Sequence, residues 1–511
     1  MTGHWVADAC RKHGPDNVLV SSFTKAAAVE LINELSRRDQ VIDDTQVGTL
    51  HAICYRAYGK PEIAEGKVKE WNEHRPHLAL GTQKSDIDDA HELGSTASEG
   101  DKLMQLAQKY RALLLARESW PDKVANFQRE WDEWKLDNRY VDFTDLIEQA
   151  PLVAPGAPTV GFFDETQDLS RLELQLARQW AKSMEYVVLV GDADQCIYGF
   201  KGADPETFIN KDADTRVLEQ SYRIPASVHR AAEAWIRRSN FRYPAVYKPR
   251  EEEGYFRLSD WSSDVPQFVD EIARTEGTHM VLASCGYMLK PIIRELRDKG
   301  LPFHNPYRTK NGSWNPMKGG ADRLLNYLLP NIERDRRWRW DELWRWVEVC
   351  VAAKTLNSGM KSVIQAKAKE EKPGIVSNDD GRACFGQHWD TLVSCLASNA
   401  PTKWLSERLS AKGEKLLRYA LTVNRLRGPG GLRDTPRVVV GTIHSVKGGQ
   451  ADHVWLSPDV SRAGQMEWLG TPNEQDGVRR LFYVGMTRAK KGCTVLHPST
   501  TTAVGDLLEL V

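Results

Sequence analysis

The chain has 511 residues, of which 41% are hydrophobic and 27% are charged; this is typical of a globular protein with more than one core. The formal net charge of −1 excludes a strong overall positive field, so any binding of nucleic acid has to use local basic patches. The eight cysteines are scattered without a C-x-x-C pair, no signal peptide opens the chain, and no apolar run reaches the length of a membrane span. We therefore expect a cytoplasmic protein with reduced thiols, no zinc site and no membrane contact.

Helical and strand patterns alternate through the N-terminal part of the chain. The apolar spacing predicts a helix that ends at Gly14, a short strand in residues 17–23 and a second helix in residues 25–38. A further strand passes into a helix between Val47 and Tyr58. This order indicates a parallel α/β sheet, and the opening helix suggests that the first strand of this sheet is missing.

A helical insertion and a linker precede the most informative strand. Residues 60–140 are helical and charged, and a linker rich in proline and alanine follows in residues 150–158. An apolar run then begins at Val160 and stops at Asp164 and Glu165, as is typical of a buried parallel strand ending in a loop. A carboxylate there can hold magnesium through water while its neighbour orients an attacking water, although the same residues also fit an acidic turn.

The remaining predicted elements continue the alternation. They are a helix in residues 171–183, a strand in 186–191, a helix starting near Pro225, a strand and a helix in 279–300, strand patterns in 437–449 and 451–456, a helix in 479–492 and a last strand in 493–498. A second helical insertion, rich in tryptophan, interrupts them in residues 304–410. Within it, Trp340, Trp344 and Val347 follow helical spacing, which favours a packed helical face over contact of the neighbouring arginines with duplex DNA.

Polar clusters fall at the predicted strand ends, where parallel sheets bind ligands. Five of them are SSFTKAAA, GTLHAIC, DETQD, GDADQCIYGFKGAD and GTIHSVKGGQ, and two more, QSYRIP and YVGMTRAK, carry arginines at helix starts. Each cluster alone also fits a turn or a helix cap. In this order, however, the set of seven closely resembles the UvrD/Rep/PcrA-type superfamily 1 DNA helicases. The resemblance extends from about Asn17 to Pro498, apart from the two insertions.

This resemblance implies an α/β fold of two RecA-like, P-loop NTPase-type parallel-sheet cores, each with a helical insertion. The expected divisions are residues 1–55 and 141–222 for the first core, 56–140 for its insertion, 223–303 and 411–511 for the second core, and 304–410 for the Trp-rich insertion.

The resemblance also implies an ATP and magnesium site. Asp164 would hold Mg²⁺, Glu165 would activate the hydrolytic water, and Gln195 would contact the γ-phosphate and that water. Arg223 and Arg488 would be two arginine fingers, a role that suits a planar and permanently charged guanidinium; an interdomain salt bridge is the alternative for either. A further implied contact is the stacking of Tyr222 on the adenine.

For a single strand of DNA, the resemblance implies contacts by aromatic, hydroxyl and imidazole groups. These belong to Phe23, Thr24, Thr49, His51, Phe200, Thr442 and His444. Aromatic side chains stack on bases, and hydroxyls bind phosphates. Core packing is the alternative for the two phenylalanines, and helix capping or core packing is the alternative for the two histidines.

The sequence departs from the family in its phosphate-binding segment. It contains no G-x-x-x-x-G-K-[ST] motif, whose amides and lysine cradle phosphates. Met1 and Thr2 lie about where that lysine and threonine would be, so we expect the preceding strand and loop to be missing and Thr2 to be a remnant of the magnesium-binding hydroxyl. Gln450 stands where the family usually has an acid, and its amide can bond to the ribose.

Three explanations of this departure are open: a miscalled start or a fragment, a separate upstream polypeptide that supplies the loop, and a degenerate helicase that only binds DNA. We expect an ATP-dependent, 3′→5′ translocating helicase that acts on single-stranded and forked DNA, and we expect the 511 residues alone to hydrolyse ATP poorly. The alternative is a non-catalytic single-strand DNA-binding module, or a subunit completed by a partner carrying the phosphate loop.

Overall fold

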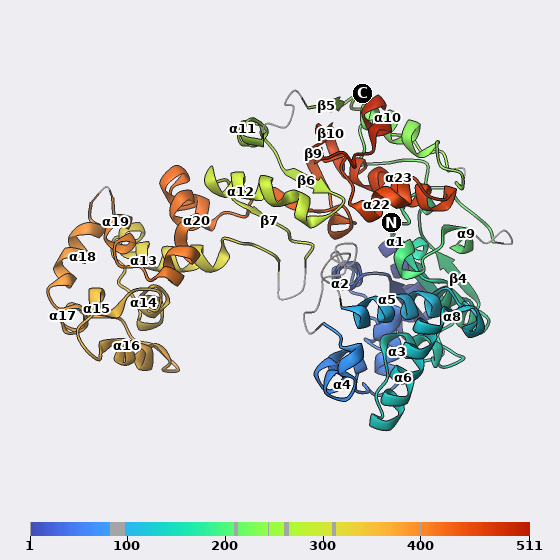
Figure 1. The fold of residues 1–511 in the computed structure, drawn as a ribbon, viewed down its shortest axis with the longest axis horizontal. Helices are drawn as coiled ribbons and strands as arrows, with labels where there is room; N and C mark the ends of the chain where they lie inside the picture. Colours follow the sequence, from blue (N-terminus) through green and yellow to red (C-terminus); the bar gives the residue numbers. More distant parts are fainter. Residues whose placement is uncertain are drawn as a thin grey trace. The chain divides into compact units, whose positions relative to one another are not determined.

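The computed structural model describes residues 2–81, 98–208, 213–243, 245–259, 265–308, 313–398 and 400–510, without the side chains of residues 2, 25, 26, 30, 207 and 208. Its helices and strands are drawn in Figure 1. The chain divides into two compact units. The first unit comprises residues 1–262, 282–288 and 441–511, and the second unit comprises residues 263–281 and 289–440.

The first unit contains a four-stranded parallel sheet. Its strands lie in the order β2 (Val47–Gly48), β1 (Val18–Ser22), β3 (Val160–Asp164) and β4 (Tyr186–Leu189). Alternate residues of a strand point to opposite faces, and both faces of this sheet are covered: Val18 and Val20 pack in one hydrophobic cluster, whereas Leu19 packs in another. Burial on both faces explains why β1 and β3 are continuously apolar.

The helices of the first unit cover this sheet, form the first insertion or lie against strands of a second sheet. They are α1 (Thr2–His13), α2 (Lys25–Ser36), α3 (Leu50–Ala57), α4 (Val68–His74), α5 (Glu99–Ala112), α6 (Asp122–Asn138), α7 (Phe143–Glu148), α8 (Arg171–Ala181), α9 (Pro205–Phe208), α10 (Ala226–Ile236), α22 (Arg462–Trp468) and α23 (Pro472–Met486). The insertion has its own core around Trp71, Phe127, Trp131 and Trp134.

A second sheet has six strands in the order β5 (Tyr255–Leu258), β10 (Ala489–Val495), β9 (Ala451–Leu456), β6 (His279–Ala283), β8 (Val438–Thr442) and β7 (Phe303–His304). The pairs β5–β10, β9–β10 and β7–β8 are parallel. The sequence did not predict β5 or β7, which are short. The helix predicted for residues 479–492 is wrong at its end, because α23 stops at Met486 and Ala489 already pairs with β9. Hydrogen bonding to the neighbouring strand outweighs the helical propensity of this segment.

The second unit is mainly helical. Its helices are α11 (Val265–Arg274), α12 (Lys290–Asp298), α13 (Lys318–Ile332), α14 (Trp340–Val347), α15 (Ala352–Thr355), α16 (Met360–Ala368), α17 (Asn378–Phe385), α18 (His388–Leu396), α19 (Thr402–Ser406), α20 (Ala411–Arg427) and α21 (Gly430–Arg433). The predicted packed face of the Trp-rich segment is confirmed, since Trp340 and Val347 are buried and Trp344 is half-buried.

The prediction of an α/β fold with two parallel sheets is thus confirmed, while the four-part division of the chain stays a prediction. Across the described ranges, every helix is too short or too polar to cross a membrane.

Candidate functional site

Most of the predicted site residues follow the carboxyl ends of the strands of the first sheet. Register places these ends at one edge, because Ser22 pairs with Asp164 and Ser21 pairs with Gly48. Phe23, Thr49 and Glu165 come directly after these strand ends, so residues far apart in the sequence gather at one edge of the sheet.

Glu165 has an unusual backbone conformation at this edge. Its φ of 53° and ψ of 39° lie in the left-handed region, although it is not a glycine. Such a conformation costs roughly 1–3 kcal/mol and is concentrated at functional sites. The carboxylate of Glu165 is partly exposed and accepts a 2.6 Å hydrogen bond from Nε2 of Gln167.

A chain of hydrogen bonds continues from Glu165 across the site. Oε1 of Gln167 accepts from the backbone N–H of Asp192 at 3.1 Å, and Nε2 of Gln195 donates to the Asp192 carboxylate at 2.6 Å. Nη2 of Arg488 then donates to Oε1 of Gln195 at 3.0 Å. Three of the predicted catalytic residues are therefore joined through two residues, Gln167 and Asp192, that the sequence reasoning did not select.

Arg488 is a buried cation and Arg223 is a half-buried one, and neither forms an ion pair with the described residues. Arg488 is 1% exposed and occupies the joint between α23 and β10, where its Nε donates to the Val484 carbonyl at 2.9 Å. Burial, followed by the neighbouring charge of Arg223, lowers the pKa of Arg488 to about 9. Burial likewise lowers the pKa of Arg223, whose Nε atom lacks a hydrogen-bond partner among the described residues.

Within the described ranges, neither guanidinium forms an ion pair with a carboxylate. Removing such charges from water is costly, and the carboxylates of Glu165 and Asp192 favour the charged form of both guanidiniums. Tyr247 and Tyr483, which are joined by a 2.9 Å hydrogen bond between their hydroxyls, lie close enough to Arg223 to affect its pKa. Sequence reasoning missed both tyrosines; the one available signal was the position of Tyr483 at the start of the YVGMTRAK cluster.

Lys447 is a cation of this site that the sequence reasoning missed. Its ammonium pairs with the carboxylate of Asp168, donates to the Gln195 carbonyl at 2.7 Å and lies 3.7 Å from Oε2 of Glu165. Burial raises the pKa of Asp168 to about 7, although Lys447 opposes this shift. Both residues belong to quoted clusters, DETQD and GTIHSVKGGQ, so the motifs themselves carried the signal.

The aromatic residues proposed for DNA contact form one cluster with Tyr198. Ring centroids lie 4.9 Å apart for Phe23 and Tyr198, 5.9 Å for Tyr198 and Phe200, and 5.7 Å for Phe200 and His444. Lys201 lies over this cluster, with Nζ 5.2 Å from the Tyr198 ring centroid. Phe23 and Phe200 are partly exposed, whereas His444 is buried.

The threonine hydroxyls predicted to contact DNA form local hydrogen bonds within the protein. Thr24 and Thr49 cap the N-termini of α2 and α3, each accepting from the backbone N–H three residues later. Thr442 is buried and accepts from a backbone N–H in the same loop. His51 lies 3.4 Å from the Glu173 carboxylate.

Two predicted residues are not joined to the other described site residues. Tyr222 is 79% exposed and Gln450 is exposed, and neither side chain makes a hydrogen bond or ring contact with another described residue. The side chain of Thr2 lies outside the described residues. Among the residues that the structure covers, no group of three or more acidic, cysteine or histidine side chains forms a ready-made metal cage.

Two family models match the chain. The UvrD/REP helicase N-terminal domain matches residues 6–216, and the UvrD-like helicase C-terminal domain matches residues 437–496. The two matches contain β1 to β4 and β8 to β10 respectively, and parallel sheets in both places fit two RecA-like helicase cores.

Individual relatives of the chain include several proteins named PcrA. The chain is 26% identical over 293 residues to the ATP-dependent DNA helicase PcrA of Bacillus subtilis, covering 50% of this chain and 37% of the relative. It is 26% identical over 332 residues to PcrA of Leuconostoc citreum (58% and 44%) and 25% identical over 262 residues to PcrA of Staphylococcus aureus (45% and 35%). The chain therefore matches less than half the length of each of these relatives.

Proposed function

Because the chain belongs to the UvrD/Rep-type superfamily 1 helicases, we propose that it is an ATP-dependent DNA helicase that translocates 3′→5′ along one strand of forked DNA. The direction rests on the resemblance of its motifs. The observation that carries the ATPase proposal is the pair Arg223 and Arg488, because two desolvated guanidiniums that form no ion pair within the described residues favour binding of an anion. The polyphosphate of a nucleotide supplies that anion.

The residues at the strand edge fit Mg²⁺ and ATP. Mg²⁺ is usually held by one or two carboxylates together with substrate phosphates, and Asp164 and Glu165 offer two carboxylates at the end of β3. When bound, Mg–ATP supplies the phosphoanhydride bond that is hydrolysed. Asp164 would hold the metal, Glu165 would accept the proton of the attacking water, and Gln195 would position Arg488 toward the γ-phosphate.

Residues around this centre complete the proposed nucleotide contacts. The exposed ring of Tyr222 has a free face for the adenine. The amide of Gln450 would bond to the ribose, and the hydroxyl of Thr2 would bind the metal.

Single-stranded DNA would bind at the aromatic cluster. Phe23 and Phe200 present partly exposed rings beside the ammonium of Lys201 and the imidazole of His444, which suits base stacking close to a phosphate. The N-terminus of α2 at Thr24 and that of α3 at Thr49 offer backbone N–H groups to phosphates. His51 and Thr442 would support this path.

One loop links the two proposed sites. The segment after β4 carries Gln195, which contacts Arg488, and Phe200, five positions later in the aromatic cluster. A change at the γ-phosphate would therefore reach the DNA-stacking residue through a short stretch of backbone. This is the type of loop rearrangement by which nucleotide hydrolases move a ligand.

The test uses two forms of the protein, the chain itself and the chain preceded by the strand and phosphate loop of a relative. DNA-stimulated ATPase, unwinding of a 3′-tailed fork and single-strand binding are measured for each, with and without Glu165→Gln. Loss of ATPase and unwinding with retained binding supports the helicase. If Glu165→Gln changes no activity of the extended form, the chain is a DNA-binding module instead.

A further inference from the structure

The second unit has a pocket that the proposed ATPase and DNA sites do not use. Its volume is about 530 Å³, within the range of pockets that bind a ligand. It lies between the end of α13, the segment after it, the start of α17 and helix α18. Its lining residues are Pro330, Asn331, Arg334, Arg336, Arg337, Trp338, Val376, Asn378, Trp389, Val393, Leu396 and Ala397.

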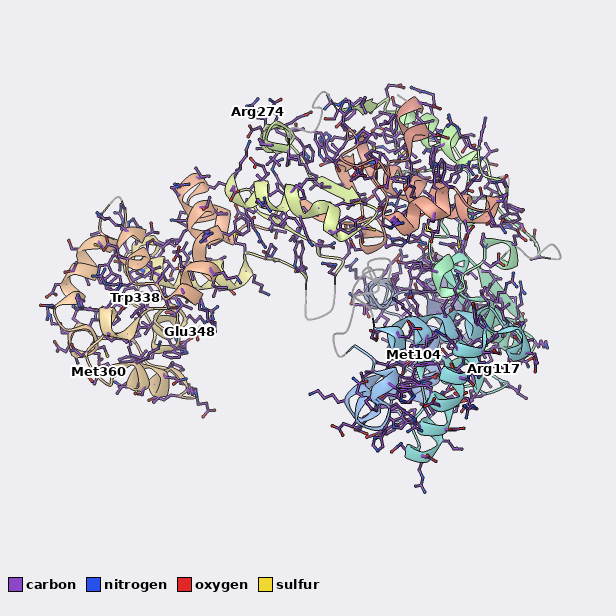
Figure 2. The ribbon with its side chains drawn as sticks, viewed as in Figure 1. Met104, Arg117, Arg274, Trp338, Glu348 and Met360 are labelled. Carbon is purple, nitrogen blue, oxygen red and sulfur yellow. The ribbon has the colours of Figure 1, made fainter. Side chains whose placement is uncertain are left out.

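The inner wall of the pocket contains two buried indole rings. Trp338, which is labelled in Figure 2, and Trp389 are 3% and 4% exposed, and their ring centroids lie 5.9 Å apart. The indole N–H of Trp338 is already used, since it donates to the Asn326 carbonyl at 2.6 Å. Trp338 also packs against Trp346, and Trp389 packs against Phe385. The low exposure of both indoles leaves little of either ring open to the pocket.

The rim of the pocket is basic. Arg336 is neutralised by Glu333 at 3.0 Å and Glu342 at 2.8 Å. Arg334 and Arg337 are exposed, and neither makes a hydrogen bond or ion pair with any residue of the described ranges. A guanidinium binds a carboxylate through two parallel hydrogen bonds, so these two side chains are available to acidic groups of a ligand.

One edge of the pocket is an exposed apolar strip on α18. Val393 is 46% exposed, and Ala397, one turn later, is also exposed. The pocket thus combines an apolar wall with two cations on its rim. Arginine and tryptophan are the residues that most often dominate protein–protein binding, with apolar anchors in pockets and charges around them.

We propose that this pocket docks an acidic peptide segment of a partner protein, with an apolar side chain against Trp338, Trp389 and Val393 and flanking carboxylates on Arg334 and Arg337. Nucleic acid fits the pocket less well. Bases stack on open ring faces, whereas Trp338 and Trp389 are almost fully buried. A concave apolar wall also offers nothing to a phosphate backbone.

The experiment is a selection of short random peptides on the full chain, followed by synthesis of the enriched sequences and measurement of their affinity by fluorescence anisotropy. We expect enriched peptides to combine a large apolar residue with at least two carboxylates. The double variant Arg334→Glu/Arg337→Glu should weaken their binding about tenfold or more, and Val393→Asp should weaken it similarly. Arg345→Glu, at an exposed arginine of α14 outside the pocket, should change it less than about twofold.

Three outcomes would overturn the proposal: no enriched sequence, enriched sequences without acidic residues, or enriched peptides that bind the double variant normally. A short DNA duplex and a single strand are titrated in parallel. If the unchanged protein binds no peptide and the double variant loses duplex binding, the pocket is a nucleic-acid surface. All substituted side chains are exposed, so an unchanged thermal unfolding midpoint checks that each variant is folded. No step requires ATP hydrolysis, so the result is independent of the proposed function.

Discussion

Nη2 of Arg488 donates a 3.0 Å hydrogen bond to Oε1 of Gln195, a residue 293 positions earlier in the chain. Gln195 lies in the loop after β4 of the first sheet, and Arg488 lies between α23 and β10 of the second sheet. An amide oxygen accepts the hydrogen bond without cancelling the charge of the guanidinium. Arg488 is therefore held in place and remains cationic, as an anion-binding group must be.

This relationship predicts opposite effects of Arg488→Met on activity and stability. Removing a buried cation that lacks a counter-ion should raise the free energy of unfolding of the unliganded protein by roughly 1–2 kcal/mol. The same change should lower the ATPase rate of the phosphate-loop-extended form by roughly 10³-fold or more. Thermal unfolding and a coupled ATPase assay measure the two effects.

The matched control is Arg129→Met, which removes an exposed arginine of α6 paired with Glu133 and should change both quantities little. A strongly destabilised but active Arg488→Met variant would mean that this arginine is structural.

Glu165→Gln should separate hydrolysis from DNA binding. The amide oxygen of the new side chain can still accept the hydrogen bond from Gln167, so the loop keeps its conformation. The variant cannot take a proton from water, and the ATPase rate of the extended form should fall roughly 10²–10⁴-fold. Single-strand affinity, measured by anisotropy, should stay within about twofold. A variant that loses both together would show that Glu165 maintains the fold of the edge.

Phe200→Ala should weaken single-strand binding. Loss of one base-stacking ring costs roughly 1–3 kcal/mol, which is about 5- to 150-fold in affinity. Phe200→Tyr keeps the ring and should bind almost normally. Leu136→Ala, at a 79% exposed residue of α6, is the control for loss of an exposed apolar side chain. Equal binding by Phe200→Ala and the unchanged protein would remove Phe200 from the DNA path.

Lys447→Met should destabilise the protein in a pH-dependent way. The pKa of Asp168 is about 7 in the folded chain and near 4 in an unfolded one, so its contribution to stability is full at low pH and is lost as the pH rises through about 7. Without the Lys447 cation this pKa rises further. At pH 6 the carboxyl is protonated in both proteins and the loss is small. At pH 8.5, about 1.5 units above the pKa of Asp168 in the unchanged protein, keeping the carboxyl protonated should cost the variant up to roughly 2 kcal/mol.

Thermal unfolding at the two pH values measures this effect. Adding Asp168→Asn to Lys447→Met should remove the pH dependence, because the amide does not titrate. An equal loss at both pH values would mean that Lys447 acts by packing alone.

Much of the fold could be predicted from the sequence because its signals are local. Apolar runs such as Val160 to Phe163 mark buried parallel strands, and they gave a correct α/β fold. The errors arose where hydrogen bonding to a neighbouring strand determines the secondary structure. Residues 489–492 have a helical composition but belong to β10, which pairs with β9. Tyr255–Leu258 forms a strand only because β10 lies beside it.

The sequence alone was enough to identify the order of the motifs and the family that they resemble. Each cluster is short and local, so it can be recognised whatever the length and sequence of the insertions between the clusters. Which of these residues meet was decided only by the tertiary structure. Hydrogen bonds between Gln195 and Arg488 and between Tyr247 and Tyr483, and the ion pair of Lys447 with Asp168, join positions far apart in the chain. No local pattern records such pairs, since they form only when the loops of two sheets come together. The same packing removes Arg223 and Arg488 from water and lowers the pKa of both.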